Sequence, residues 1–95
     1  MAAYLIVDTN VRDPEAYREY MQKVTPLIAK FGGKYLVRGG PFTVLEGKWR
    51  PTRLVVIEFA DRAAIDAWYT SLEYAPLIPL RHRAADTDLV VVDGV

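Results

Sequence analysis

The sequence has 95 residues, enough for one domain around a single core, and its 12 basic and 12 acidic residues leave no net charge. This balance argues against a protein whose main function is to bind nucleic acid, because such a protein needs a strong excess of positive charge. No cysteine is present, which excludes disulfides and thiol chemistry. No segment approaches the roughly 20 apolar residues of a membrane span. We therefore expect one cytoplasmic domain over residues 1–95, without membrane or nucleic-acid partners.

The first third of the chain predicts a strand followed by a long helix. Residues 3–8 are short, apolar and partly β-branched, as in a strand. Asp13 and Pro14 form the pattern of an N-cap followed by the first helical residue. Gly32 and Gly33 end the helix. Its apolar residues recur at steps of three and four, as a core-facing stripe does: Tyr17, Tyr20, Met21, Val24, Leu27, Ile28 and Phe31.

The middle of the chain predicts a β-hairpin. Residues 34–38 form the second expected strand, a bulge at 39–41 interrupts it, and residues 42–46 resume it. Residues 47–51 turn the chain, and the third strand follows at 53–59.

The last third predicts two helices and a strand. Asp61 caps a second helix, and Ser71 caps a proline-interrupted segment that reaches residue 83 and contains a short third helix. Residues 89–92 form the fourth strand. The order β-α-β-β-α-β is typical of the ferredoxin-like α+β fold, with a four-stranded antiparallel sheet.

The strands are apolar on both faces, although right-handed crossovers place both main helices on one side of the sheet. In the third strand, Val55, Ile57 and Phe59 point one way and Leu54 and Val56 the other. An apolar face of several hundred Å² is more than a soluble monomer leaves in water. We expect an obligate homodimer that packs these faces together as a dimeric α/β barrel.

The few polar groups of the uncovered face are the candidate catalytic residues. By alternation, Glu58 lies with Leu54, and Asp8 lies with Tyr4. If the two middle strands pair as a hairpin, Arg38 comes near Glu58. We predict Arg38, Glu58 and Asp8 as catalytic residues beside Tyr4, because an arginine can hold an acidic oxygen and a buried carboxylate can transfer a proton. Alternatively, Arg38 and Glu58 form a structural ion pair that fixes the dimer register.

The aromatic residues are candidates for substrate binding. Trp49 in the hairpin turn is either a lid over the cleft or a contact with the partner subunit. Trp68, Tyr74 and Arg81 belong to one aromatic, proline-rich segment and contact either the substrate or the core. His82 is the only histidine, and we interpret it as an exposed helical residue. No cofactor and no metal site are predicted, since there is no cysteine and no histidine pair.

Together these features resemble the DUF1330 family over nearly the whole chain. The matching segments are Asp13-Pro14-Glu15-Ala16-Tyr17, residues 32–40, Leu45-Glu46-Gly47, Val56-Ile57-Glu58-Phe59, and the run from Trp68-Tyr69 through Ser71 and Glu73-Tyr74 to Arg81. The resemblance implies a branch of the dimeric α/β-barrel superfamily, and so a homodimer with a cleft between sheet and helices. Its wider relatives include cofactor-free monooxygenases, muconolactone isomerase and haem-dependent chlorite dismutases. This sequence has no counterpart of the proximal haem histidine.

Two functions follow from these observations. The first is a cofactor-independent enzyme, isomerase-like or monooxygenase-like, acting on a small apolar or carboxylated molecule. The second is a non-catalytic ligand-binding or assembly module whose buried charges fix the dimer register.

Overall fold

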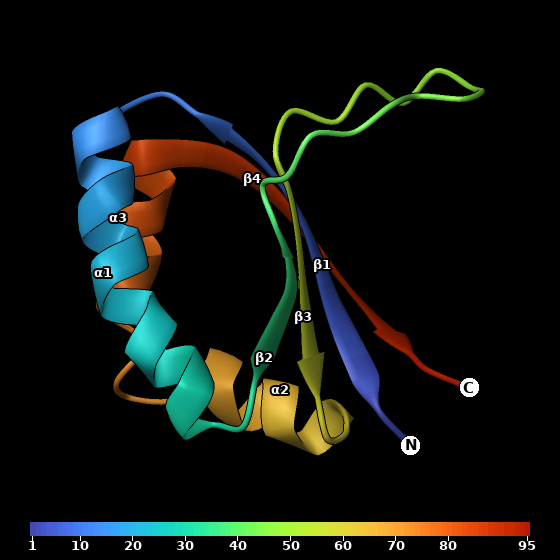
Figure 1. Ribbon diagram of the computed structural model, residues 1–95. Helices are drawn as coiled ribbons and strands as arrows, with labels where there is room; N and C mark the ends of the chain where they lie inside the picture. The colour runs from blue at the N-terminus through green and yellow to red at the C-terminus, as the bar shows by residue number, and fades with distance from the viewer.

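The computed structural model describes residues 1–95 as four strands and three helices. In chain order these are β1 (Ala3–Val11), α1 (Pro14–Lys30), β2 (Lys34–Arg38), β3 (Leu54–Phe59), α2 (Arg62–Tyr69), α3 (Leu77–Ala84) and β4 (Ala85–Asp93). The strands form one antiparallel sheet in the order β2-β3-β1-β4. Helices α1 and α3 lie on the same side of this sheet (Figure 1). The ferredoxin-like α+β fold predicted from the sequence is therefore confirmed.

The two predicted aspartate caps are confirmed. The side chain of Asp13 accepts a hydrogen bond from the backbone N–H of Ala16 at 3.2 Å, ahead of α1. Asp61 accepts one from Ala64 at 2.8 Å, ahead of α2. Each cap satisfies a backbone donor that has no partner inside its helix. Both helices therefore begin at the residues that local chemistry dictates.

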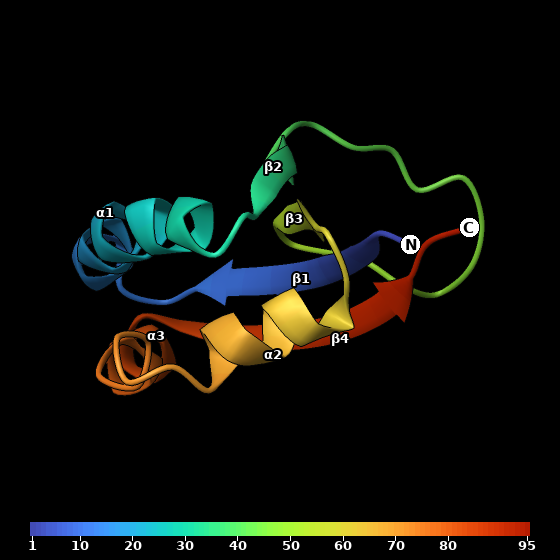
Figure 2. The ribbon, with the colours of Figure 1, turned by 90° about the horizontal axis from the view of Figure 1, so that it is seen from below.

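Ser71 caps the segment that follows it, as predicted, but this segment begins as a turn and not as α3. Its hydroxyl donates to the carbonyl of Trp68 at 2.8 Å and accepts from the N–H of Tyr74 at 3.1 Å, which closes a turn directly after α2. Helix α3 begins only at Leu77, after Pro76, without a side-chain cap. In the view of Figure 2, α1 lies toward β2, and α3 lies toward β4 at the opposite edge of the sheet.

The core lies between the helices and one face of the sheet, which we call the inner face. Strand β1 contributes Leu5 and Val7 to it, and β3 contributes Ile57 and Phe59. Trp68 and Tyr74 complete this core, with their ring centroids 4.3 Å apart. The predicted apolar stripe of α1 packs here through Tyr20, Val24, Leu27 and Ile28.

Strand β2 ends earlier than predicted, and its bulge lies elsewhere. The register shifts between Tyr35 and Val37, so the bulge is at Leu36 and not at residues 39–41. The strand ends at Arg38, before Gly39, whose φ of +72° leaves the extended region. Pro41 then offers no N–H to continue the ladder. These two residues explain why the ladder stops here.

Residues 39–53 form a long connection that we call the arm, and the predicted strand at 42–46 is absent. The arm projects away from the sheet (Figure 1). Three of its large apolar side chains are exposed: Phe42, Leu45 and Trp49. A connection of this length without secondary structure is uncommon inside a compact domain, and such segments usually serve function or binding.

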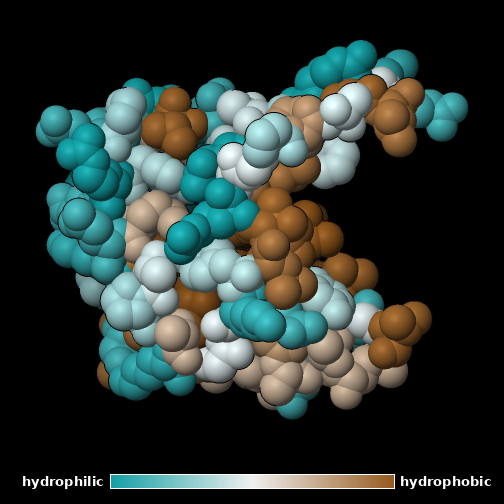
Figure 3. All heavy atoms as spheres, viewed as in Figure 1, coloured by the Kyte–Doolittle hydropathy of each residue, from teal (hydrophilic) through white to brown (hydrophobic).

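The second face of the sheet, which we call the outer face, is covered by no helix. By register it carries Ile6 of β1, Val56 of β3, and Val90 and Val92 of β4. Val90 is 58% exposed and Val92 is 42% exposed. Hydrophobic atoms gather on this side below the arm (Figure 3). The sequence-based expectation of an uncovered apolar face is confirmed. None of the three helices has the length and hydropathy to cross a membrane.

Gly33 tests how tightly α1 packs on the sheet. A Cβ at this position would lie 2.6 Å from Cγ2 of Ile28 and 2.8 Å from the ring of Phe59, and both side chains are fully buried. We expect Gly33→Ala to lower the free energy of unfolding by about 1–3 kcal/mol through overpacking. Gly40→Ala is the matched control, because a Cβ there meets no atom within 4 Å. Urea denaturation of both variants measures the difference, and equal stabilities would contradict this packing.

Candidate functional site

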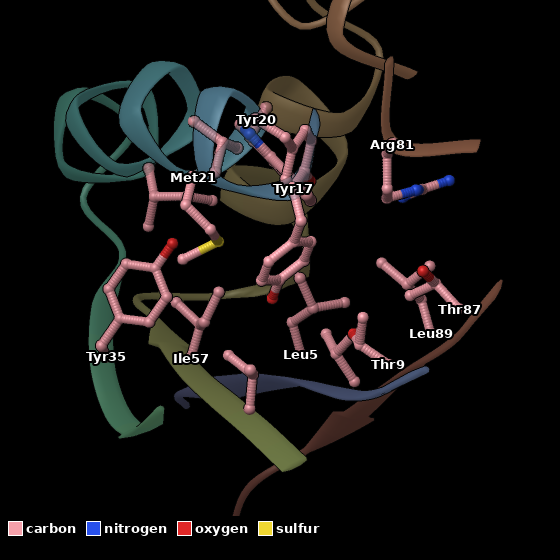
Figure 4. Close-up of a pocket in the computed structure, with 15 residues that line it drawn as sticks. Leu5, Thr9, Tyr17, Tyr20, Met21, Tyr35, Ile57, Arg81, Thr87 and Leu89 are labelled. Carbon is pink, nitrogen blue, oxygen red and sulfur yellow. The ribbon is translucent and has the colours of Figure 1, made fainter. Parts of the chain in front are cut away.

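A pocket opens between the inner face and helices α1 and α3 (Figure 4). Twelve of its fifteen lining residues are hydrophobic. The cavity has a volume of about 40 Å³, well below the roughly 300–1,000 Å³ of typical small-molecule sites. The pocket is therefore a narrow apolar slot.

Helix α1 supplies one wall of the pocket. Tyr17, Tyr20, Met21 and Val24 line it because their spacing of three and four residues places them on one helical face. The rings of Tyr17 and Tyr20 project from α1 into the slot (Figure 4). The core-facing stripe predicted from the sequence thus also lines a cavity.

The three polar lining residues, Thr9, Arg81 and Thr87, gather at one end of the slot (Figure 4). Thr9 of β1 and Thr87 of β4 are directly opposite each other in the antiparallel register. The Thr87 hydroxyl oxygen is buried and has no hydrogen-bond partner, and the same holds for Nε1 of Trp68, another lining residue. An unpartnered buried polar group is costly, so each such group requires an explanation.

Arg81 is the most unusual residue of the pocket, since its side chain is charged and only 6% exposed. Nη1 donates to the hydroxyl of Tyr74 at 3.0 Å, and Nη2 lies 3.2 Å from Nε2 of His82. Nε has no partner. None of the four ion pairs of the protein includes Arg81. The guanidinium is therefore buried without a counter-charge.

Two tyrosine hydroxyls extend the contacts of Arg81. The hydroxyl of Tyr74 lies 2.8 Å from that of Tyr20 in the buried interior. Burial raises the pKa of Tyr74, and the Arg81 guanidinium opposes this only in part. Burial raises the pKa of Tyr20 far above its usual value. Both phenols are thus neutral near pH 7 and act as hydrogen-bonding groups rather than as bases.

Two further arginines lie beside the partly exposed tyrosines of the pocket. The guanidinium of Arg53 lies 5.7 Å from the ring centroid of Tyr17, and its Nε donates to the Tyr17 hydroxyl at 3.2 Å. The guanidinium of Arg38 lies 5.2 Å from the ring centroid of Tyr35. Neither arginine takes part in an ion pair. Positive charge therefore flanks two tyrosines of the lining.

The predicted meeting of Arg38 and Glu58 does not occur. Glu58 pairs in register with Lys34, whereas Arg38 pairs with Val55. The main reason is the register, because pairing with Lys34 places Glu58 four residues along β2 from Arg38. The bulge at Leu36 also switches the faces of the residues that follow it. Arg38 thus shares the side of Val55, the inner face, and Glu58 stays on the outer face.

Glu58 and Tyr4 do meet on the outer face. They are directly opposite in β3 and β1, and the Tyr4 hydroxyl donates to Oε2 of Glu58 at 3.2 Å. This hydrogen bond to a carboxylate raises the pKa of Tyr4. Neither residue lines the pocket.

Asp8 holds the base of the arm. Its carboxylate accepts hydrogen bonds from the N–H of Thr52 at 2.9 Å, the indole of Trp49 at 3.1 Å and the N–H of Arg53 at 3.4 Å. It is opposite Leu54 in β3, not Glu58, so the two predicted catalytic carboxylates are not neighbours. Trp49 lies at the base of the arm and does not line the pocket.

Comparison with known proteins decides the family. The model of a domain of unknown function, DUF1330, matches residues 2–95. The chain belongs to the DUF1330 family. No curated protein matches the sequence significantly.

Solved structures share the fold of this DUF1330 protein at low sequence identity. A protein of unknown function from Rhodopseudomonas palustris is 19% identical with a TM-score of 0.82, over 99% of this chain and 82% of that one. A dimeric ferredoxin-like protein of unknown function from Jannaschia sp. CCS1 is 17% identical with a TM-score of 0.74, over 99% and 100%. SnoaB, a cofactor-independent oxygenase from Streptomyces nogalater, is 11% identical with a TM-score of 0.69, over 99% and 93%.

The DUF1330 fold thus brings together only part of the predicted site. Trp68 and Arg81 line the pocket. Tyr74 does not line it, but its hydroxyl accepts a hydrogen bond from Arg81. Sequence reasoning missed Thr9 and Thr87, because the first strand was predicted to end at residue 8 and the fourth to begin at residue 89. The alternation of side chains in β1 and β4 continues through both threonines, and this pattern could have assigned them to the inner face. No three histidine, aspartate or glutamate side chains gather where they could hold a metal ion.

The carboxylate of Asp8 gives a pH test of the arm. Burial raises the pKa of Asp8, but the hydrogen bonds from Thr52, Trp49 and Arg53 outweigh this and leave the pKa below its usual value. A lowered folded-state pKa contributes stability above the unfolded value of 3.8, and this contribution is lost as the pH falls through the folded value. We expect Asp8→Asn to destabilise the protein at pH 7 by about 1 kcal/mol.

This difference should shrink as the pH falls below about 4, because the natural carboxylate becomes neutral there. Asp66→Asn is the matched control, since its exposed side chain makes no hydrogen bond or ion pair. Thermal unfolding between pH 2.5 and 7 measures both variants. A constant Asp8→Asn difference over this range would contradict the charged role of Asp8.

Proposed function

We propose that this DUF1330 protein is a homodimer, and that each protomer binds a small apolar or carboxylated molecule in the pocket between sheet and helices and acts on it without a cofactor. The observation that carries the proposal is the pocket itself, an apolar slot with a buried arginine at one end. Such a combination of apolar walls and a few converging polar groups is typical of ligand sites.

The proposed chemistry is isomerase-like or monooxygenase-like. A buried cation in an apolar slot stabilises negative charge that develops on a substrate oxygen, and in a water-poor site this interaction is strong. Arg81 is placed for that role, and Arg38 near Tyr35 is placed to orient an acidic group of the ligand. The similar fold of SnoaB, a cofactor-independent oxygenase, supports a reaction of this class.

The proposed dimer joins the two outer faces. Val56, Val90 and Val92 lie there without any helix to cover them. The Jannaschia relative, which has the same fold, is dimeric. A second copy related by a two-fold axis covers such a face with an identical one.

A second candidate function is a non-catalytic binding or assembly module, and the outer-face charges favour it. The Asp8 carboxylate accepts three hydrogen bonds at the base of the arm, and the Glu58 carboxylate accepts one from Tyr4. In the proposed dimer these carboxylates would be enclosed between the sheets, where buried charges set register. This arrangement assigns Asp8 and Glu58 to assembly and leaves the pocket to the ligand.

The dimer is tested by a charge on the outer face. Val90→Lys places a lysine at an exposed valine of the monomer, so the fold tolerates it, but the two-fold axis brings two unpaired lysines into the interface. We expect dimer dissociation to become easier by about 100-fold or more. Sedimentation velocity at micromolar concentration measures the state. Leu72→Lys, at a 91% exposed leucine, is the control and should stay dimeric. A monomeric natural protein would refute the dimer.

Ligand binding is tested with single-ring compounds, which suit a narrow slot. Benzamide and benzoate are titrated into ¹⁵N-labelled protein, and the amide shifts of pocket residues such as Leu5 and Ile57 are followed. Met21→Trp fills the slot and should weaken binding about tenfold or more. Gln22→Trp, at the next, exposed position of α1, should bind like the natural protein. If neither compound shifts the pocket amides at millimolar concentration, the proposed function is wrong.

A further inference from the structure

We propose that the polar end of the pocket is an anion site, so that the ligand is a small apolar molecule carrying a carboxylate or an equivalent anionic oxygen. This inference rests on the proposed function and narrows it, because an apolar slot alone would accept neutral molecules equally well. The groups that carry it are Arg81, Thr87 and the pair of tyrosine hydroxyls behind Arg81.

Arg81 carries a buried charge that no ion pair neutralises. A guanidinium stays protonated in proteins, so burial cannot neutralise it as it would a lysine or a carboxylate. A buried charge without a partner is strongly unfavourable. The two groups that contact Arg81, the Tyr74 hydroxyl and the His82 imidazole nitrogen, bring no negative charge. The site is therefore complete only when an anion joins it.

Two hydrogen-bond donors at this end of the slot have no partner. Nε of Arg81 and the hydroxyl of Thr87 are both buried without partners and line the same end of the slot (Figure 4). An ionised carboxylate only accepts hydrogen bonds, and its two oxygens offer about four sites. Bonds between a guanidinium and a carboxylate are also among the strongest in proteins. The donor set thus matches a carboxylate better than a neutral amide, which carries donors of its own.

Two tyrosine hydroxyls continue the hydrogen bonds of Arg81 toward the slot. Tyr74 is fully buried and accepts from Nη1 of Arg81, and its oxygen lies 2.8 Å from that of Tyr20, in a bond where either hydroxyl is able to donate. Tyr20 lines the pocket. When Tyr74 donates in this bond, the proton of Tyr20 is free to reach an anionic oxygen in the slot.

The acidic residues nearest to this end in the chain do not compensate Arg81. Asp86 and Asp88 flank Thr87 in β4, and alternation places their side chains on the opposite face. Asp86 forms an ion pair there with Arg12 at 3.2 Å. The inner side of the strand therefore keeps its positive character.

The test compares two ligands of the same shape. Benzoate and benzamide differ in charge and in hydrogen-bond donors, and the natural protein should bind benzoate about tenfold more tightly or better in ¹⁵N shift titrations at pH 7. Arg81→Met should remove this preference while benzamide still binds. Thr87→Val should reduce the preference several-fold. Arg83→Met removes an exposed arginine of the same helix and should leave the preference intact.

The outcomes separate this inference from the proposed function. Equal affinities of the natural protein for the two ligands would overturn the anion site and leave the proposed pocket standing. No binding of either ligand would overturn both. A preference for benzoate that survives in Arg81→Met would also refute the assignment. If Arg81→Met does not fold, the ratio in the natural protein and the Thr87→Val variant still decide the matter.

Discussion

The alternation of the central strand β1 is the constraint on which the rest of the structure depends. Between β3 and β4, β1 sends Leu5, Val7 and Thr9 to the pocket and Tyr4 and Ile6 to the outer face. A slip of one residue would exchange these two sets completely. The ligand slot and the apolar outer face are therefore the two sides of one strand, and no change of register can alter one without altering the other.

The sequence predicted those elements whose signals are local. The capping aspartates, the apolar stripe of α1 and the apolar strands each follow from neighbouring residues, and all are present. The bulge was predicted at residues 39–41 but lies at Leu36, because the position of a bulge depends on how a strand pairs with its neighbour. That single extra residue moved Arg38 to the inner face, away from the face of Glu58, which pairs with Lys34 four residues earlier. The predicted strand in the arm is absent because Gly39 and Pro41 end the ladder.

The pocket could be predicted only in part, for a different physical reason. Core stripes and cavity linings have the same pattern, since both place apolar side chains of a helix against a sheet. Whether Tyr17 and Tyr20 fill the interior or border a slot depends on the volume of all their neighbours, which no single segment encodes. Arg81 and Trp68 were found because an arginine and a tryptophan in a proline-rich segment are conspicuous. Thr9 was not, because a threonine in a strand is ordinary.

The contacts of Arg53 join the start of the arm to the lining of the pocket. Its guanidinium lies directly against Gly39, where the arm begins, so that any side chain at position 39 would collide with it. The same guanidinium lies over the ring of Tyr17, a pocket residue. A displacement of Tyr17 would therefore be transmitted to the arm through one side chain. Position 39 and the pocket lining thus share one side chain, and a substitution at Gly39 would displace the guanidinium that Tyr17 also contacts.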